Sequence, residues 1–100
     1  MFTNKKVTLY LGLTTNYGKK LDKGNVKQTI IETIPTDACT IIETNGVWKG
    51  ETEESLKIEF IVENEEIGKD VLDYGERLTR RFSQDVVLAT IEDTQMKIIS

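Results

Sequence analysis

Hydrophobic and polar residues alternate along two segments of the chain, 7–13 and 55–63. In each segment every second residue is apolar, which is the pattern of a β-strand with one buried face. Two further β-prone runs, 38–44 and 85–91, predict additional strands. The sequence therefore predicts four main strands, of which the first and third are the most regular.

Turn-forming residues predict where these strands end. Asn45-Gly46 is the dipeptide with the strongest preference for a tight turn, and we expect the strand over 38–44 to end there. Residues 50–54 are expected to form an acidic connector. Glu92-Asp93-Thr94 predicts a turn into a short final strand that carries Met96 and Ile98.

Two other segments have helical spacing. Asn25 followed by Gln28 resembles a capping box and predicts the start of the first helix, which Pro35 should end. Asn64 is the predicted N-cap of a longer second helix. Apolar residues three and four apart form the buried stripe of that helix: Ile67, Val71, Tyr74, Leu78 and Phe82.

The order β-α-β-β-α-β predicts a ferredoxin-like α+β domain that spans residues 1–100 as a single unit. Its antiparallel sheet would have the first and third strands at the centre and both helices on one face. The other face would carry Tyr10, Ile61 and one apolar set, either Cys39 and Ile41 or residues 87, 89 and 91. Such an apolar face predicts a homo-oligomer that associates through it.

The amino-acid composition argues against several classes of function. The chain has 17 acidic and 13 basic residues, a net charge of −4 and no histidine. An acidic chain is a poor partner for long nucleic acid, and the lack of histidine removes the commonest metal ligand and general base. Cys39, the single cysteine, has no histidine to activate it and is expected to be a packed thiol. We therefore expect no catalytic residues, no metal and no cofactor, and a protein that is not an enzyme.

Residues that suit a small anion fall into two groups, Arg77, Arg80 and Arg81 near the end of the second helix and the loop over 14–20. Arginines at a helix C-terminus are also favoured by the helix dipole alone, and turns are polar in any case. Trp48 is a candidate for stacking on a ligand or for covering the sheet edge. With Gln84, the predicted ligand-binding residues are Thr14, Thr15, Asn16, Tyr17, Lys19, Trp48, Arg77, Arg80, Arg81 and Gln84.

Three short blocks resemble an uncharacterised bacterial family catalogued only as a domain of unknown function. They are Tyr10-Leu11-Gly12-Leu13, the Gly46-Val47-Trp48 turn, and the block Phe82-Ser83-Gln84-Asp85-Val86-Val87-Leu88. This chain has leucine before the first-strand glycine where the family has an aromatic residue. The resemblance implies the ferredoxin-like fold and marks Gly46, Trp48 and Gln84 as positions to test, but it implies no activity.

Three functions remain open from the sequence. The first is a non-enzymatic ligand-binding module, similar in style to phage sponge proteins that sequester a nucleotide or cyclic nucleotide signal as an anti-defence device. The second is a protein interaction domain that acts through the open sheet face, and the third is a small cofactor-free dimeric enzyme. No segment has the length of a membrane span or the pattern of a signal peptide. We therefore expect the protein to be located in the cytoplasm, which is that of the host cell if the chain is viral.

Overall fold

Four strands pair side by side in one antiparallel sheet in the order β2-β3-β1-β4. In this computed structural model the description covers residues 2–99, without the side chains of residues 2, 3 and 48. The strands are β1 (Phe2–Gly12), β2 (Thr40–Trp48), β3 (Glu51–Val62) and β4 (Leu88–Met96). The two most regular predicted strands, β1 and β3, are central neighbours as expected.

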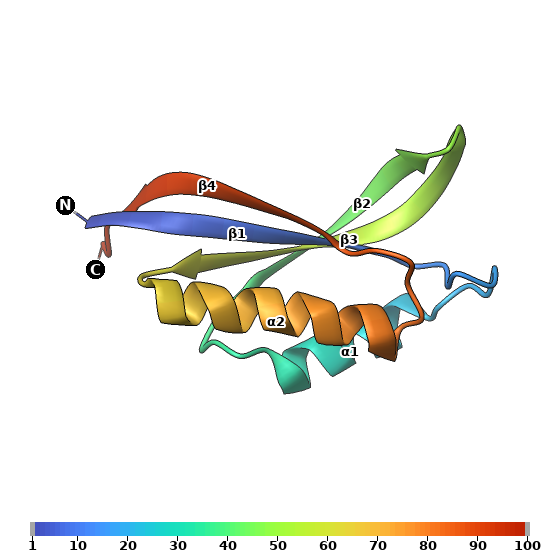
Figure 1. Cartoon of the computed structure of the whole chain (residues 1–100), viewed down its shortest axis with the longest axis horizontal. Coiled ribbons are helices and arrows are strands. Elements are labelled where there is room, and N and C mark those ends of the chain that lie inside the picture. The colour runs from blue at the N-terminus through green and yellow to red at the C-terminus, as the bar shows by residue number, and fades with distance from the viewer. Residues whose placement is uncertain (1, 100) are drawn as a thin grey trace.

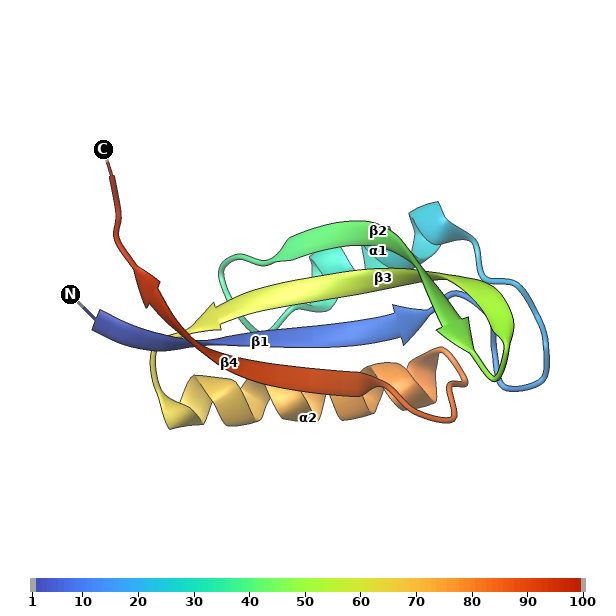
Figure 2. The same cartoon turned by 90° about the horizontal axis from the view of Figure 1, so that it is seen from above.

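Two helices, α1 (Lys23–Thr33) and α2 (Glu65–Arg81), cover the same face of this sheet (Figure 1). Seen from above, both helices lie beneath the strands and the opposite face is open (Figure 2). The chain is thus a small α+β domain, consistent with a ferredoxin-like fold. Among the described residues no helix is both long enough and apolar enough to span a bilayer.

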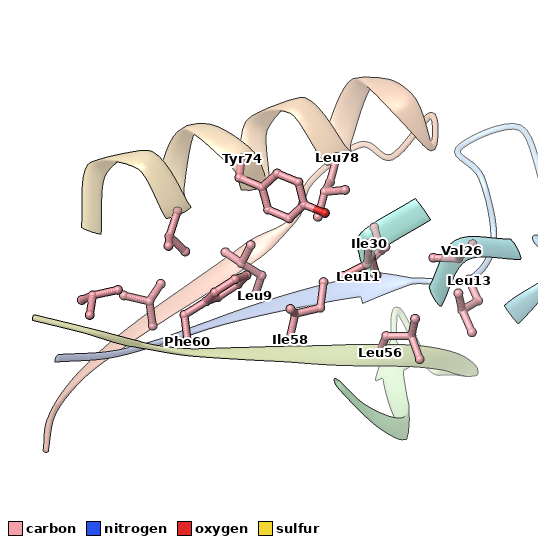
Figure 3. Packing of buried hydrophobic residues seen from close by; sticks show 13 residues of the cluster. Leu9, Leu11, Leu13, Val26, Ile30, Leu56, Ile58, Phe60, Tyr74 and Leu78 are labelled. Atoms are coloured by element: carbon pink, nitrogen blue, oxygen red, sulfur yellow. The ribbon is translucent and has the colours of Figure 1, made fainter. Parts of the chain in front are cut away.

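The core forms where the alternating strands meet the helical stripes (Figure 3). The rings of Phe60 on β3 and Tyr74 on α2 pack edge to face, with centroids 6.3 Å apart. Val71 and Leu78 are buried beside Tyr74, which confirms the predicted stripe of α2. The buried cluster is made of Val7, Leu9, Leu11, Leu13, Val26, Ile30, Leu56, Ile58, Phe60, Val62, Val71, Tyr74 and Leu78.

Strand register decides which residues face away from the helices. Because side chains alternate along a strand, Thr8, Tyr10 and Gly12 lie on the open face while Leu9 and Leu11 are buried. On that face Tyr10 is opposite Lys57, and Thr8 is opposite Glu59. The centre of the open face is therefore polar.

The prediction of an apolar set on this open face is wrong. Cys39 and Ile41, like Val87 and Ala89, pack against the buried cluster on the helix side. Burial raises the pKa of the Cys39 thiol, as expected for a packed thiol without an activating neighbour. Tyr10 and Ile61 do lie on the open face, with Leu88 opposite Tyr10.

The hairpin between β2 and β3 is longer than predicted. Asn45 and Gly46 pair with Glu54 and Glu53, so the predicted turn and residues 51–54 of the predicted connector are strand. The chain reverses instead at Lys49 and Gly50, whose φ angles are 51° and 80°. Two successive residues with positive φ form the hairpin turn that matches strand twist, and a glycine at the second position makes it accessible.

Two further predictions are corrected by hydrogen bonding. The N-cap of α1 is Asp22, whose carboxylate accepts from the backbone N–H of Asn25 at 2.8 Å, so Asn25 lies inside the helix. β4 runs through 92–94 without a turn, and there is no separate final strand in the described chain. The reason is that β1 begins at Phe2, so Asn4, Lys5 and Lys6 pair with these residues. The predicted cap of α2, Asn64, is confirmed by its bond to the N–H of Ile67 at 2.9 Å.

Candidate functional site

The loop over 14–20 and the end of α2, two segments that the sequence singled out, are held together. The backbone N–H of Asn16 donates to the carbonyl of Ser83 at 2.7 Å. The side-chain amide of Gln84 donates to the carbonyls of Thr14 and Phe82, both at 3.1 Å. These bonds fix the loop against the segment that leaves α2, although the two are about seventy residues apart in sequence.

Within this loop the predicted ligand residues separate into two kinds. Thr15 is buried, and its hydroxyl accepts from the backbone N–H of Lys19 at 2.9 Å, so its role is to shape the turn. Asn16, Tyr17 and Lys19 are exposed, and Tyr17 is 68% accessible. The aromatic and basic side chains of this loop therefore point into solvent and do not converge on one another.

The arginines of α2 have contacts that fit helix stabilisation. The guanidinium of Arg77 lies 5.6 Å from the ring centroid of Tyr74, within range of a cation-π contact. Arg80 approaches Glu76 at 3.7 Å, and both side chains are about 70% exposed, so this pair contributes little. Arg81 is exposed at the last position of the helix. Trp48 ends β2, within strand and not in a turn, and its side chain lies outside the description.

A carboxylate and an amide converge above Gly12, the last residue of β1. An ideal Cβ built on Gly12 would overlap Oε1 of Glu53 and would lie 3.2 Å from Oε1 of Gln84. A side chain at Gly12 would therefore displace the Glu53 carboxylate, so glycine is what allows this carboxylate to lie directly over the strand. We refer to Gly12, Glu53 and Gln84 as the Gly12 site.

Sheet geometry explains this convergence. Gly12 pairs with Ser55, and Glu53 lies one strand repeat further along β3, on the same open face. The N–H of Leu13 donates to the carbonyl of Glu54 at 2.9 Å, which keeps the chain against β3 beyond the end of β1. Gln84 arrives from the connection between α2 and β4. Gln84 is among the residues predicted from the sequence, whereas Gly12 and Glu53 are not, because their proximity depends on the register between β1 and β3.

Next to the Gly12 site, the open face carries a group that we call the polar strip: Lys6, Thr8, Tyr10, Lys57, Glu59 and Thr90. The ammonium of Lys6 is 3.1 Å from Glu59, and that of Lys57 is 3.9 Å from the same oxygen. The hydrogen bond and charge of Glu59 raise the pKa of Lys6. Lys57 also lies 5.7 Å from the ring centroid of Tyr10.

Two hydroxyls complete the polar strip. Thr8 is 2% exposed although it is on the open face, where Glu59 and Thr90 lie opposite it on the two neighbouring strands. The hydroxyl oxygen of Thr90, opposite Thr8, is buried without a hydrogen-bond partner in the described part of the chain. Buried hydroxyls in folded proteins usually have a hydrogen-bond partner, and a water molecule, an ion or a ligand can supply the one that Thr90 lacks.

A separate hollow of about 480 Å³ lies at the opposite end of β1, beside the start of α2. Its surface is mainly apolar, with Val7, Val62, Leu72 and Ile91 among the lining residues. Among residues 2–99 no cluster of three or more metal-ligating side chains occurs. Asn4, Glu63 and Lys69 also line this hollow. On the open face, an acid and an amide meet at the Gly12 site, and two lysines lie beside Glu59 in the polar strip.

Comparison with known proteins bears on the fold. No family model matches the chain, and no curated protein matches, so the resemblance to the uncharacterised family stays a prediction. Among solved structures the chain is similar to a phage SAM lyase in complex with S-methyl-5′-thioadenosine, with a TM-score of 0.70 and 22% identity over 90% of this chain and 81% of that one. A phage SAM lyase in the apo state gives a TM-score of 0.72 at 22% identity, over 91% and 81% of the two chains.

This finding contradicts the prediction that the chain is not an enzyme. Both similar structures are of an enzyme, and the TM-scores show that its fold is similar to that of this chain. The prediction relied on the lack of histidine, yet carboxylates and lysines also act as acids and bases in enzymes. Absence of histidine therefore does not exclude catalysis on this fold.

Proposed function

We propose that the chain cleaves S-adenosylmethionine, or a closely related sulfonium nucleoside, at the Gly12 site and releases S-methyl-5′-thioadenosine. The observation that carries the proposal is the convergence of Glu53 and Gln84 on Gly12, in a fold similar to that of the phage SAM lyase. A carboxylate is the side chain that suits a permanently cationic sulfonium group. The proposal replaces the earlier hypothesis of a non-catalytic sponge.

The chemistry requires one bond to break, the bond between the sulfonium sulfur and the γ-carbon of the amino-acid chain. Its electron pair moves to sulfur, which becomes the neutral thioether of S-methyl-5′-thioadenosine. The remaining carbon chain then either loses a proton to form a double bond or is attacked by its own carboxylate to form a lactone. Neither route needs histidine, a metal or a cofactor.

Glu53 and Gln84 suit different parts of this reaction. At about 4 Å a carboxylate attracts a unit positive charge by about 4 kcal/mol at an effective dielectric of 20. The carboxylate of Glu53 would hold the sulfonium and, in the elimination route, accept the proton. The amide of Gln84 is anchored on two backbone carbonyls, so its oxygen is presented in a fixed direction toward Gly12.

The biological role that follows from this proposal is anti-defence by degradation of a methyl donor in the host cell. Similarity to a phage enzyme supports it. A catalyst removes many molecules per chain, whereas a sponge removes one per site. We also retain the proposal of a homo-oligomer, because the exposed side chains of Ile42, Ile61 and Leu88 lie beside the polar strip, and a second copy would cover them.

The test is to incubate the purified protein with S-adenosylmethionine and to follow products by liquid chromatography and mass spectrometry. We expect S-methyl-5′-thioadenosine to accumulate with protein-dependent kinetics. The second product identifies the route, since elimination gives an unsaturated amino acid and internal attack gives a lactone. Glu53→Gln should lower the rate by roughly a hundredfold, in the range for loss of a charged group that acts in the transition state.

Glu51→Gln provides the matched control. It removes the same charge from the same face of β3, one strand repeat further from Gly12, and should keep the wild-type rate. Release of S-methyl-5′-thioadenosine no faster than without protein would refute the enzymatic proposal. If the nucleoside still raised the melting temperature in that case, the chain would be a binding protein.

A further inference from the structure

The polar strip begins one strand repeat from the Gly12 site. Gly12 and Tyr10 lie on the same face of β1, about 6.8 Å apart along the strand, and Lys57 is directly opposite Tyr10. A substrate whose sulfonium lies at Gly12 would therefore extend its amino-acid chain toward Tyr10 and Lys57 or away from the sheet. Which direction the amino-acid chain takes depends on the groups of the polar strip that it would contact.

Lys57 has the properties of an anion receptor. Its side chain is 31% exposed, and its nearest carboxylate oxygen, on Glu59, is 3.9 Å away, which is too far for a hydrogen bond. The ring of Tyr10 lies 5.7 Å from its ammonium group and limits the positions that this group can take. The ammonium group of Lys57 has three N–H donors. It can therefore donate hydrogen bonds to a carboxylate without losing a strong existing bond.

Glu59 complements Lys57 two residues further along β3. Its side chain is 19% exposed and is paired with Lys6 at 3.1 Å. A carboxylate offers about four acceptor positions, so one lysine does not saturate it, and a second cation can bind beside Lys6. The unpaired hydroxyl of Thr90 is on the same row of the sheet, opposite Thr8.

We infer that the polar strip binds the zwitterionic amino-acid end of the substrate, with Lys57 on its carboxylate and Glu59 on its ammonium group. This inference rests on the proposed function, because it assumes that a nucleoside with an amino-acid chain occupies the Gly12 site. The strip thereby acts as a specificity site: it distinguishes the substrate from S-methyl-5′-thioadenosine, which lacks both charged groups. Loss of these contacts after cleavage favours release of the product nucleoside.

The test compares two stable nucleosides by isothermal titration calorimetry. S-Adenosylhomocysteine carries the amino-acid end, and S-methyl-5′-thioadenosine does not. Lys57→Met should weaken binding of S-adenosylhomocysteine by roughly ten- to hundredfold, the range for a hydrogen bond to a charged group. Binding of S-methyl-5′-thioadenosine should stay within about twofold of wild type on the same scale.

Lys57→Arg should restore most of the lost affinity because it keeps the positive charge. Lys69→Met, on the exposed surface of α2, controls for the change in net charge and should alter neither affinity. If Lys57→Met leaves the ratio of the two affinities unchanged, the inference is wrong while the proposed function stands. If wild-type protein binds neither nucleoside and releases no S-methyl-5′-thioadenosine, both the inference and the proposed function fall.

Discussion

At the scale of single residues, Gly12 shows how the lack of a side chain creates a site. Its Cα lies under Glu53 and Gln84, and even a methyl group would compete with the carboxylate for space. Gly46, on the neighbouring part of β2, is different, because a Cβ there would meet only the hydroxyl of Ser55 at an ordinary 3.9 Å. The two glycines therefore form a natural comparison.

We predict that Gly12→Ala lowers the rate of S-methyl-5′-thioadenosine release at least tenfold, because the new methyl displaces the Glu53 carboxylate. Stability should change by no more than about 1 kcal/mol, since the displaced group ends a flexible side chain. Gly46→Ala should keep the wild-type rate and raise the free energy of unfolding by about 0.4–1 kcal/mol, because alanine fits this strand position without strain. Product analysis together with urea denaturation measures both. Equal activity of the two variants would contradict the role given to Gly12.

Tyr74 supplies a second prediction at this scale. Thr33 donates to the carbonyl of Thr29 at 2.7 Å, so the hydroxyl of Tyr74 must donate to Thr33, at 2.8 Å. Tyr74→Phe removes this bond between α2 and α1 and should lower the free energy of unfolding by about 1 kcal/mol. Thr33→Val and the double variant with Tyr74→Phe complete a double-mutant cycle. This cycle measures the coupling free energy between the two hydroxyl groups.

This hydroxyl also predicts a pH dependence. Burial raises the pKa of Tyr74 above its ordinary value of 10.0, so the unfolded chain loses this proton first as pH rises. The unfolded state then binds fewer protons, and stability falls with rising pH above about pH 10. The stability difference between wild type and Tyr74→Phe should therefore be constant below that pH and should shrink above it, as measured by urea denaturation. A constant difference at all pH values would contradict the assignment.

At the scale of elements, short-range signals in the sequence predict the helices and strands themselves better than the positions where these elements meet. The stripe of α2 and its Asn64 cap depend only on neighbours within a few residues, and both are confirmed. The end of β2 depends on the pairing of Asn45 and Gly46 with Glu54 and Glu53. The turn preference of the dipeptide gives no information about this pairing. The Gly12 site is missed for the same reason, since its members come from two strands and a connection.

The start of α1 provides the prediction for this scale. Asp22 accepts the N–H of Asn25, whereas Asn25 is already within the helix. Asp22→Ala should therefore lower the free energy of unfolding by about 1 kcal/mol, the usual effect of losing an N-cap. Asn25→Ala should change it by less than about 0.5 kcal/mol on the same scale. If urea denaturation shows that Asn25→Ala is more destabilising than Asp22→Ala, the capping box at Asn25 forms and the assignment of Asp22 as N-cap is wrong.

At the scale of the whole molecule, the open face raises the question of self-association. Exposed Ile42, Ile61 and Leu88 lie next to charged residues that are partly shielded from water. Exposed apolar side chains gathered on one face favour a protein contact there, even though the core of a subunit interface is usually depleted of charged residues. A second copy that covers the face would also enclose the Gly12 site.

We therefore predict a defined oligomer in sedimentation velocity at micromolar concentration. Leu88→Lys should shift it to monomer, because a lysine on the covered row would bury an unpaired charge. Leu72→Lys, at an exposed position of α2 on the helix side, is the control and should keep the wild-type state. A wild-type monomer under these conditions would remove the proposed interface but not the Gly12 site.

β1 and β3 place the core on one face of the sheet and the Gly12 site with the polar strip on the other. Both faces therefore depend on the same two-residue repeat of the strands. Insertion of one residue in the middle of β1 would turn Tyr10 and Gly12 inward and send Leu9 and Leu11 into water. Substitutions can alter the chemistry and leave the fold intact, whereas a change in strand length damages both together. Variation in this protein should consequently enter through side-chain exchange on the exposed positions and through loop length, while the spacing within the two central strands stays fixed.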